Sequence, residues 1–216
     1  MNTTHVIAVG PFAADVAMVL QRREVDAGPT LFAQGHGVPA DLLPPAGTYV
    51  LVTSRHDSKL VAEVGELAWK WGASFVPVVH EKHWLRAGPL ILPGETGACA
   101  ECFERRSTQH STIGKAMSDL HAFYAADPAG PGGHLPSQVL MAAGLAQWGL
   151  AALRRGDSRT HGAYRAVNLT KAQFLQGRTV GVHGCARCYP ASTPISRQDR
   201  SWRGLAGHLT GAKGHA

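Results

Sequence analysis

The four cysteines of this 216-residue sequence form two Cys-x-x-Cys pairs, Cys99 with Cys102 and Cys185 with Cys188. In a protein from a reducing compartment, two such pairs on separate segments are typical of a tetrathiolate zinc site. The two-residue spacer lets both sulfurs of a pair point at one metal ion about 2.3 Å away. Four thiolates leave no coordination position open, so we expect a structural zinc that does not activate water.

Two other chemistries use the same kind of residue. A thioredoxin-like redox site needs only one Cys-x-x-Cys, placed at a turn from a strand to a helix. Four cysteines could also hold an iron–sulfur cluster. Zinc is favoured because nothing else in the sequence indicates electron transfer. Residues 103–184 separate the two pairs, so the metal is expected to staple distant segments of one fold. With every cysteine assigned to metal and no Ser-His-Asp order in view, we predict no catalytic residue.

The composition fits one globular domain, with 44% hydrophobic residues and a formal net charge of +6. The basic residues form no block of like charges, which favours a solvated basic surface and no nucleic-acid partner. The first residues lack the regions of a signal peptide, and no apolar run is long enough to span a membrane. We therefore expect a cytoplasmic protein without a membrane partner, in which ordinary disulfides stay reduced.

The first element is a strand at residues 5–10, followed by a helix that starts directly after Gly10. A dinucleotide-binding Gly-x-Gly-x-x-Gly would stand at this turn, but Pro11, Phe12 and Ala13 replace the rest of its first part. Without the second glycine, the backbone cannot approach a pyrophosphate closely. The turn therefore predicts a plain βα unit, and we expect no ATP binding there.

A second βα unit is clearer, with a strand at 48–54, a helix at 58–72 and a further strand at 74–79. Ser58 is the predicted N-cap of this helix and Gly72 its predicted C-cap. A short additional strand is expected near Leu31. Strands that alternate with helices predict an α/β, Rossmann-like, mostly parallel sheet with flanking helices and right-handed crossovers.

The second half of the chain is predicted to serve the metal site. Residues 83–102 form an extended crossing into the first cysteine pair, and the weakly patterned region 108–136 ends in a loop at 125–136. The strongest helix pattern spans 137–156, with Ser137 as its predicted cap. Two antiparallel strands at 164–184 lead to the second pair. After Pro190 the sequence is polar and rich in glycine, so we expect a domain at 1–190 and a flexible tail at 191–216.

These elements, in this order, resemble the ThiF/MoeB-like, ubiquitin-activating-enzyme-like domain over about residues 5–190. The similarity is closest to the branch from azole- and azoline-forming ribosomal-peptide biosynthesis, known as cyclodehydratase C or ocin-ThiF-like proteins. That branch carries its zinc ligands in two motifs, which match GPLILPGETGACAEC at 88–102 and HGCARC at 183–188. The resemblance implies that Cys99, Cys102, Cys185 and Cys188 bind zinc.

The departures from the family bear on its chemistry. Adenylating members have a full glycine loop, an acidic residue after the second strand, an arginine that reaches the phosphates and a catalytic aspartate. This sequence lacks the loop, and the other residues have no clear match. Asp57 stands near the place of the family's magnesium-binding aspartate, but a role at a helix N-terminus is favoured for it. The family's peptide-binding winged-helix segment is not expected, because the first strand starts at His5.

The leading interpretation is therefore a non-catalytic partner in the biosynthesis of a ribosomally made, modified peptide. It would present a precursor peptide to a YcaO-type ATP-dependent cyclodehydratase, or activate that enzyme. The alternative is an adenylating enzyme of the ThiF/MoeB type with a degenerate nucleotide site. A third interpretation is a structural subunit whose only role is to form a homodimer or a heterodimer, with Trp69, Trp71 and Trp148 as candidate apolar contacts. The strands at 83–92 and the loop at 125–136 are the surfaces expected to take up a peptide.

Overall fold

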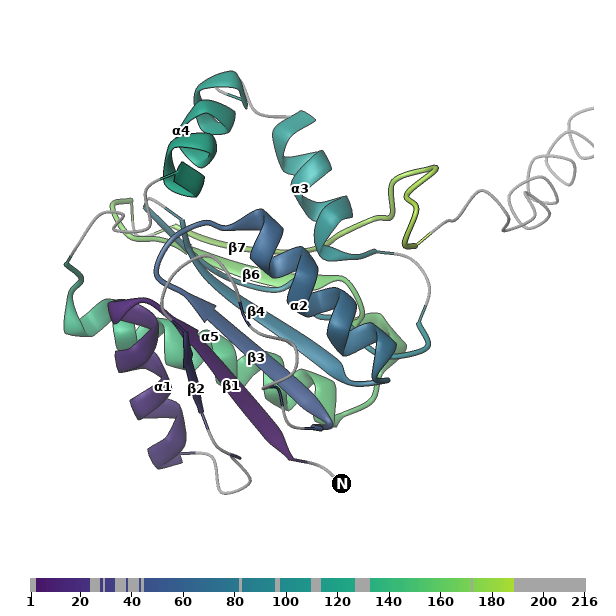
Figure 1. The fold of residues 1–216 in the computed structure, drawn as a ribbon, viewed down its shortest axis with the longest axis horizontal. Coiled ribbons are helices and arrows are strands. Elements are labelled where there is room, and N and C mark those ends of the chain that lie inside the picture. Colours follow the sequence, from purple (N-terminus) through teal and green to yellow (C-terminus); the bar gives the residue numbers. More distant parts are fainter. Residues whose placement is uncertain are drawn as a thin grey trace, which may run out of the picture.

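The computed structural model describes residues 3–188, with gaps at 24–27, 29, 34–37, 39–42, 44, 82, 96–97, 110–113, 127–132 and 172. Its centre is a seven-stranded sheet in the order β2-β1-β3-β4-β5-β6-β7 (Figure 1). The predicted tail at 191–216 and the centre of the predicted loop at 125–136 lie outside the described residues.

The sheet has a parallel part and an antiparallel part. Its parallel strands are β2 (Leu31–Ala33), β1 (Thr4–Val9), β3 (Thr48–Thr53) and β4 (Ser74–Glu81). The antiparallel strands that follow are β5 (Trp84–Ala87), β6 (Ala163–Asn168) and β7 (Phe174–Arg178). The predicted α/β class with flanking helices is confirmed, as are the short strand at Leu31 and the late antiparallel pair.

Helices cover both faces of the sheet (Figure 1). On one face lie α1 (Pro11–Arg23) and α5 (Pro136–Arg154), which pack on Val6, Val50 and Val76. On the other face, α2 (Ser58–Lys70) packs on Ile7, Leu51 and Phe75, and α3 (Ala100–Gln109) lies beside α2. Because both faces are covered, the central strands are continuous apolar runs instead of alternating ones.

Several helix boundaries differ from those that the sequence predicts. The N-cap of α2 is Asp57, whose Oδ1 accepts a hydrogen bond from the backbone N–H of Leu60 at 2.9 Å, so the prediction of Ser58 is wrong. Helix α5 begins at Pro136, one residue before the predicted cap Ser137. Two helices were not predicted: α3, which begins inside the expected extended crossing at 83–102, and α4 (Gly114–Ala126), which lies in the weakly patterned region at 108–136. A 3-10 turn spans Ser158–Thr160.

The position of β5 also corrects an expectation. Residues 83–92 were expected to offer an exposed strand edge, but β5 pairs with β4 on one side and with β6 on the other. Both of its edges are therefore occupied within the sheet. Among the described residues, no helix combines the length and the apolar character that crossing a membrane requires.

Candidate metal centre

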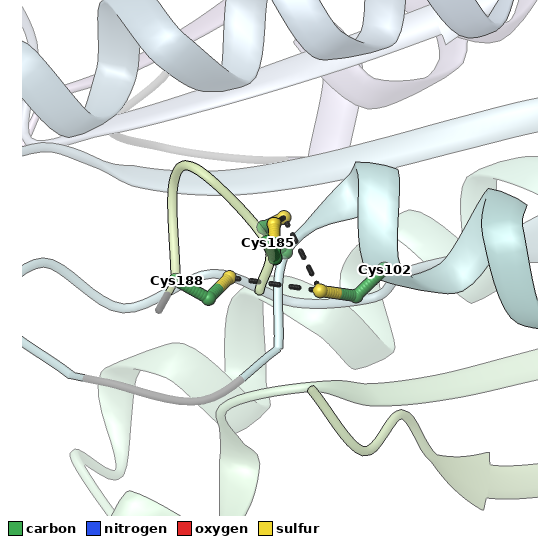
Figure 2. A group of neighbouring side chains, drawn as sticks. Cys102, Cys185 and Cys188 are labelled. Carbon is green, nitrogen blue, oxygen red and sulfur yellow. Dashed lines mark hydrogen bonds between the residues drawn. The ribbon is translucent and has the colours of Figure 1, made fainter. Parts of the chain in front are cut away.

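The fold brings all four predicted cysteines together. Their sulfur atoms lie within 4.8 Å of one another, with Cys99, Cys102 and Cys185 buried and Cys188 partly exposed. Figure 2 shows the side chains of Cys102, Cys185 and Cys188 converging from the start of α3 and from the segment after β7. The sequence prediction that the two pairs meet is confirmed.

The spacing of the sulfurs fits a tetrahedral metal ion. The Sγ atoms lie 3.7 Å apart in Cys99–Cys102, 3.8 Å apart in Cys99–Cys185 and 3.8 Å apart in Cys102–Cys188. Metal–sulfur bonds of about 2.3 Å place neighbouring sulfurs of a tetrahedron about 3.8 Å apart. A disulfide would bring two sulfurs to about 2.05 Å. The cluster therefore has the dimensions of a four-thiolate zinc site, and all four cysteines are free thiols.

The electrostatics of the cluster also fit a cation. Hydrogen bonding from Cys188, opposed by burial, lowers the pKa of the Cys99 thiol to about 5. The same hydrogen bond, together with burial and the neighbouring sulfurs, raises the pKa of Cys188 above its ordinary range. Burial likewise raises the pKa of Cys102. Sulfurs this close cannot all carry negative charge unless a cation lies among them, so metal binding here must release protons.

Local backbone structure sets the second cysteine pair. The backbone N–H of Val182 donates to the Sγ of Cys102 at 3.3 Å, and the N–H of Cys185 donates to the carbonyl of Val182 at 3.1 Å. Gly184 supplies the positive φ of 72° that this tight turn needs. The first pair is set by α3, where the N–H of Phe103 donates to the carbonyl of Cys99 at 3.1 Å.

Two arginines fix the segment after β7 to the helices. Arg106 of α3 donates to the carbonyls of Val180 at 2.6 Å and Gly181 at 2.9 Å. Arg187, inside the second pair, donates to the carbonyl of Ala62 and to Glu66 of α2, both at 3.1 Å. The cysteine cluster therefore closes a corner that joins α2, α3 and the end of the sheet.

A buried cluster of charged residues beneath α3 was not predicted from the sequence. His56, which follows β3, lies 3.6 Å from Glu81 and 3.4 Å from Glu104. Arg86 of β5 lies 3.3 Å from Glu104, and its guanidinium stacks 4.2 Å from the ring centroid of Phe103. The one signal in the sequence was a lone arginine inside the apolar strand 84–87.

The environment of His56 favours its charged form. Burial acts to lower the pKa of His56, but the interaction with the Glu81 carboxylate and the negative charge of Glu104 outweigh it. The pKa of His56 is therefore raised above its ordinary value. When protonated, the His56 ring links the carboxyl end of β4 to α3, the helix that carries Cys102.

The turn after β1 lies where open α/β sheets bind ligands, at the carboxyl ends of the strands where the strand order reverses. Here the Oγ of Ser54 accepts a hydrogen bond from the backbone N–H of Ala13 at 3.1 Å. Gly10 has a φ of 90°, and a Cβ at this position would lie 2.5 Å from the Oγ of Ser54. The absence of a Cβ at Gly10 therefore makes room for the side chain of Ser54.

Aromatic side chains pack beside this turn. The buried ring of Phe12 lies 4.9 Å from the ring of His80 and 5.4 Å from that of His134, centroid to centroid. The Nε2 of His134 lies 2.6 Å from a carboxylate oxygen of Asp15 on α1. Burial lowers the pKa of His80. Side chains from α1, β4 and the residues before α5 therefore pack together beside this turn.

The remaining candidates lie apart from these sites. Asp57, considered as a magnesium ligand, is the N-cap of α2. Trp69 and Trp71 of the α2 end are exposed, whereas Trp148 of α5 is half-buried beneath the guanidinium of Arg165. These three side chains therefore do not gather into one surface.

No protein-family model matches the sequence, and no curated protein matches it significantly. Solved structures are similar to it. The heterocyclase TruD has a TM-score of 0.59 and 18% identity over 91% of this chain. The E. coli microcin synthetase McbBCD complex has a TM-score of 0.60 and 13% identity over 86% of this chain. E. coli MccB with ATP has a TM-score of 0.55 and 12% identity over 87% of this chain.

The matches cover different shares of those proteins. The match spans 29% of the TruD chain, and 67% of the McbBCD component and of MccB. The chain thus corresponds to under a third of the heterocyclase. The resemblance that the sequence indicates is confirmed at the level of the fold: the chain shares the fold of these heterocyclase, microcin synthetase and MccB structures.

Proposed function

We propose that this chain is a non-catalytic partner in the biosynthesis of a ribosomally made, post-translationally modified peptide. In this role it presents the precursor peptide to a YcaO-type ATP-dependent cyclodehydratase, or activates that enzyme, during thiazoline or oxazoline formation. The chemistry belongs to the partner, and the complex works in the cytoplasm. The folding domain extends over residues 1–190, and the polar residues 191–216 follow it as a tail.

The observation that carries the proposal is the closed turn between β1 and α1. A nucleotide-binding turn leaves the N-terminus of its helix open to phosphate. In this chain the hydroxyl of Ser54 already accepts the N–H of Ala13 there, and the ring of Phe12 packs against His80. A donor that could bind phosphate at this turn is thus already bonded within the chain, which favours a role in binding other proteins over a role in binding nucleotide. The fold shared with a heterocyclase and a microcin synthetase supports a role in the biosynthesis of a modified peptide.

The cysteine cluster supports the same role. The four sulfurs have the separations of a tetrahedral site, and their crowded thiols favour a divalent cation. We assign zinc to Cys99, Cys102, Cys185 and Cys188. With four protein ligands, the ion has no position for water or substrate, so it stabilises the corner between α2, α3 and the sheet without taking part in catalysis.

The second candidate is an adenylating enzyme of the ThiF/MoeB type. It is favoured by the likeness to MccB, which has been solved with ATP. An adenylating enzyme transfers AMP from ATP to a carboxylate and releases pyrophosphate, whereas a non-catalytic partner does not. Pyrophosphate release by the isolated chain with peptide and Mg-ATP therefore separates the two functions.

The proposed function is tested by reconstitution. A YcaO-type cyclodehydratase is given a precursor peptide and ATP, with and without the chain, and ring formation is followed by mass spectrometry as loss of water. The expected result is a complex between the two proteins and a sharp fall in ring formation when the chain is withheld.

A further inference from the structure

Strand β7 ends the sheet and has one side on which no described strand pairs with it. Hydrogen-bonded pairs alternate along an antiparallel ladder. The N–H of Asn168 donates to Gln173 and that of Thr179 donates to Gly162, so the odd-numbered residues of β7 face β6. The backbone N–H and C=O groups of Phe174, Gln176 and Arg178 therefore point away from the sheet. We call this row, within Phe174–Arg178, the β7 edge.

Both faces beside the β7 edge carry exposed apolar side chains. Phe174 is 52% exposed and pairs with Val167, which belongs to the face covered by α5. Leu175 is 42% exposed and pairs with Ala166, so it stands on the opposite face. An added strand would cover part of both side chains. Unpaired strand edges with apolar flanks are sites where extended peptides join a sheet.

Three guanidinium groups surround the same edge without a carboxylate partner among the described residues. Arg165 lies 4.6 Å from the ring of Trp148 and 5.7 Å from that of Phe174. Arg178 donates to the carbonyl of His161 at 3.0 Å, and Arg106 donates to two carbonyls just beyond β7. Neutral rings and carbonyls orient these side chains but leave their positive charge uncompensated. The β7 edge is therefore basic.

We infer that the β7 edge binds an extended, acidic peptide segment, which joins the sheet as an additional strand. If the proposed function holds, on which this assignment rests, the segment belongs to the precursor peptide. Two other occupants are disfavoured by charge. A second copy would bring a second set of the same basic side chains to the edge, and the residues from 191 onward carry four basic side chains against one acidic. The inferred peptide surface is therefore β7, whereas the sequence predicted the strands at 83–92, which include β5.

The test uses two substitutions at one position. Gln176→Pro removes an N–H that points away from the sheet and so spares the ladder with β6, whereas Gln176→Ala keeps that N–H. The probe is a short fluorescein-labelled peptide in which glutamate alternates with valine, and its control replaces glutamate by lysine. Fluorescence anisotropy measures binding to the full chain, and thermal unfolding confirms that each variant is folded.

The wild type and Gln176→Ala should bind the glutamate peptide, and Gln176→Pro should bind it roughly tenfold more weakly or worse. Arg165→Gln should weaken binding at low salt and change it less at high salt, which keeps the test valid if the proline variant fails to fold. Three results would overturn the assignment: equal binding of the lysine peptide, unchanged binding of the glutamate peptide by both Gln176→Pro and Arg165→Gln, or self-association of the chain without peptide binding.

The same variants separate this inference from the proposed function. If the wild type and Gln176→Pro support ring formation equally and also bind the peptide equally, peptide binding at the β7 edge is wrong and the proposed function stands. If the peptide binds at β7 but the chain has no effect on ring formation, the edge stands and the proposed function fails.

Discussion

The Oγ of Ser54 accepts a hydrogen bond from the backbone N–H of Ala13 at 3.1 Å, so the end of β3 closes the first turn of α1. In a dinucleotide-binding fold, free N–H groups at this place hold the pyrophosphate. The Cβ that any other residue would add at Gly10 has no room beside Ser54. Gly10 therefore leaves room for the side chain of Ser54, which bonds to the first turn of α1.

The first prediction follows from that contact. Mg-ATP should leave the melting temperature of the isolated chain unchanged. A ligand at a hundredfold excess over its dissociation constant would raise the free energy of unfolding by about 2.7 kcal/mol. For a chain of this length, that corresponds to roughly 5–10 °C. Differential scanning fluorimetry, with an adenylating enzyme as the positive control, measures it; a rise of that size would support the second candidate function.

The second prediction concerns the metal. The purified chain should contain about one zinc ion, and Cys102→Ser should lose most of it and unfold at a markedly lower temperature, because metal binding is coupled to folding. A chelator should lower the melting temperature of the wild type toward that of the variant and change the variant little. Elemental analysis and calorimetry give both quantities. A metal-free chain with full stability would contradict the zinc assignment.

The sequence indicates some of these features and conceals others. The apolar runs of β1, β3 and β4 and the spacing of the cysteines are local patterns, so the βα units and the meeting of the four cysteines were predictable. Helix α3 has a polar sequence, and its position depends on contacts such as Arg86 with Glu104 that no local pattern reveals. The internal place of β5 depends on strand order, which arises only when β6 returns to pair with it.

The third prediction tests a local correction. Asp57→Ala should lower the free energy of unfolding by about 1 kcal/mol, because its carboxylate caps α2 through the N–H of Leu60. Ser58→Ala, one residue later, should change it by less than about 0.5 kcal/mol. Urea unfolding of both variants makes the comparison. A larger loss in the free energy of unfolding for Ser58→Ala than for Asp57→Ala would indicate that Ser58 is the N-cap of α2.

The fourth prediction is a pH dependence. The folded-state pKa of His56 is raised, so its protonated form stabilises the fold below the unfolded value of about 6.5. This contribution is lost as the pH rises through the folded-state pKa. The melting temperature of the wild type should exceed that of His56→Gln most near about pH 6 and progressively less above it. His83→Gln, at an exposed position, is the control. A difference that grows with pH would contradict the ion pairs with Glu81 and Glu104.

The most direct measurement of the central claim is the rate of ring formation by the partner cyclodehydratase, with ATP and precursor peptide supplied. Reactions contain the enzyme alone, the enzyme with the wild-type chain, or the enzyme with the zinc-deficient Cys102→Ser chain. We predict fast ring formation only with the wild-type chain, and no pyrophosphate release by that chain on its own. Equal rates of ring formation with and without the chain would contradict its role as a partner.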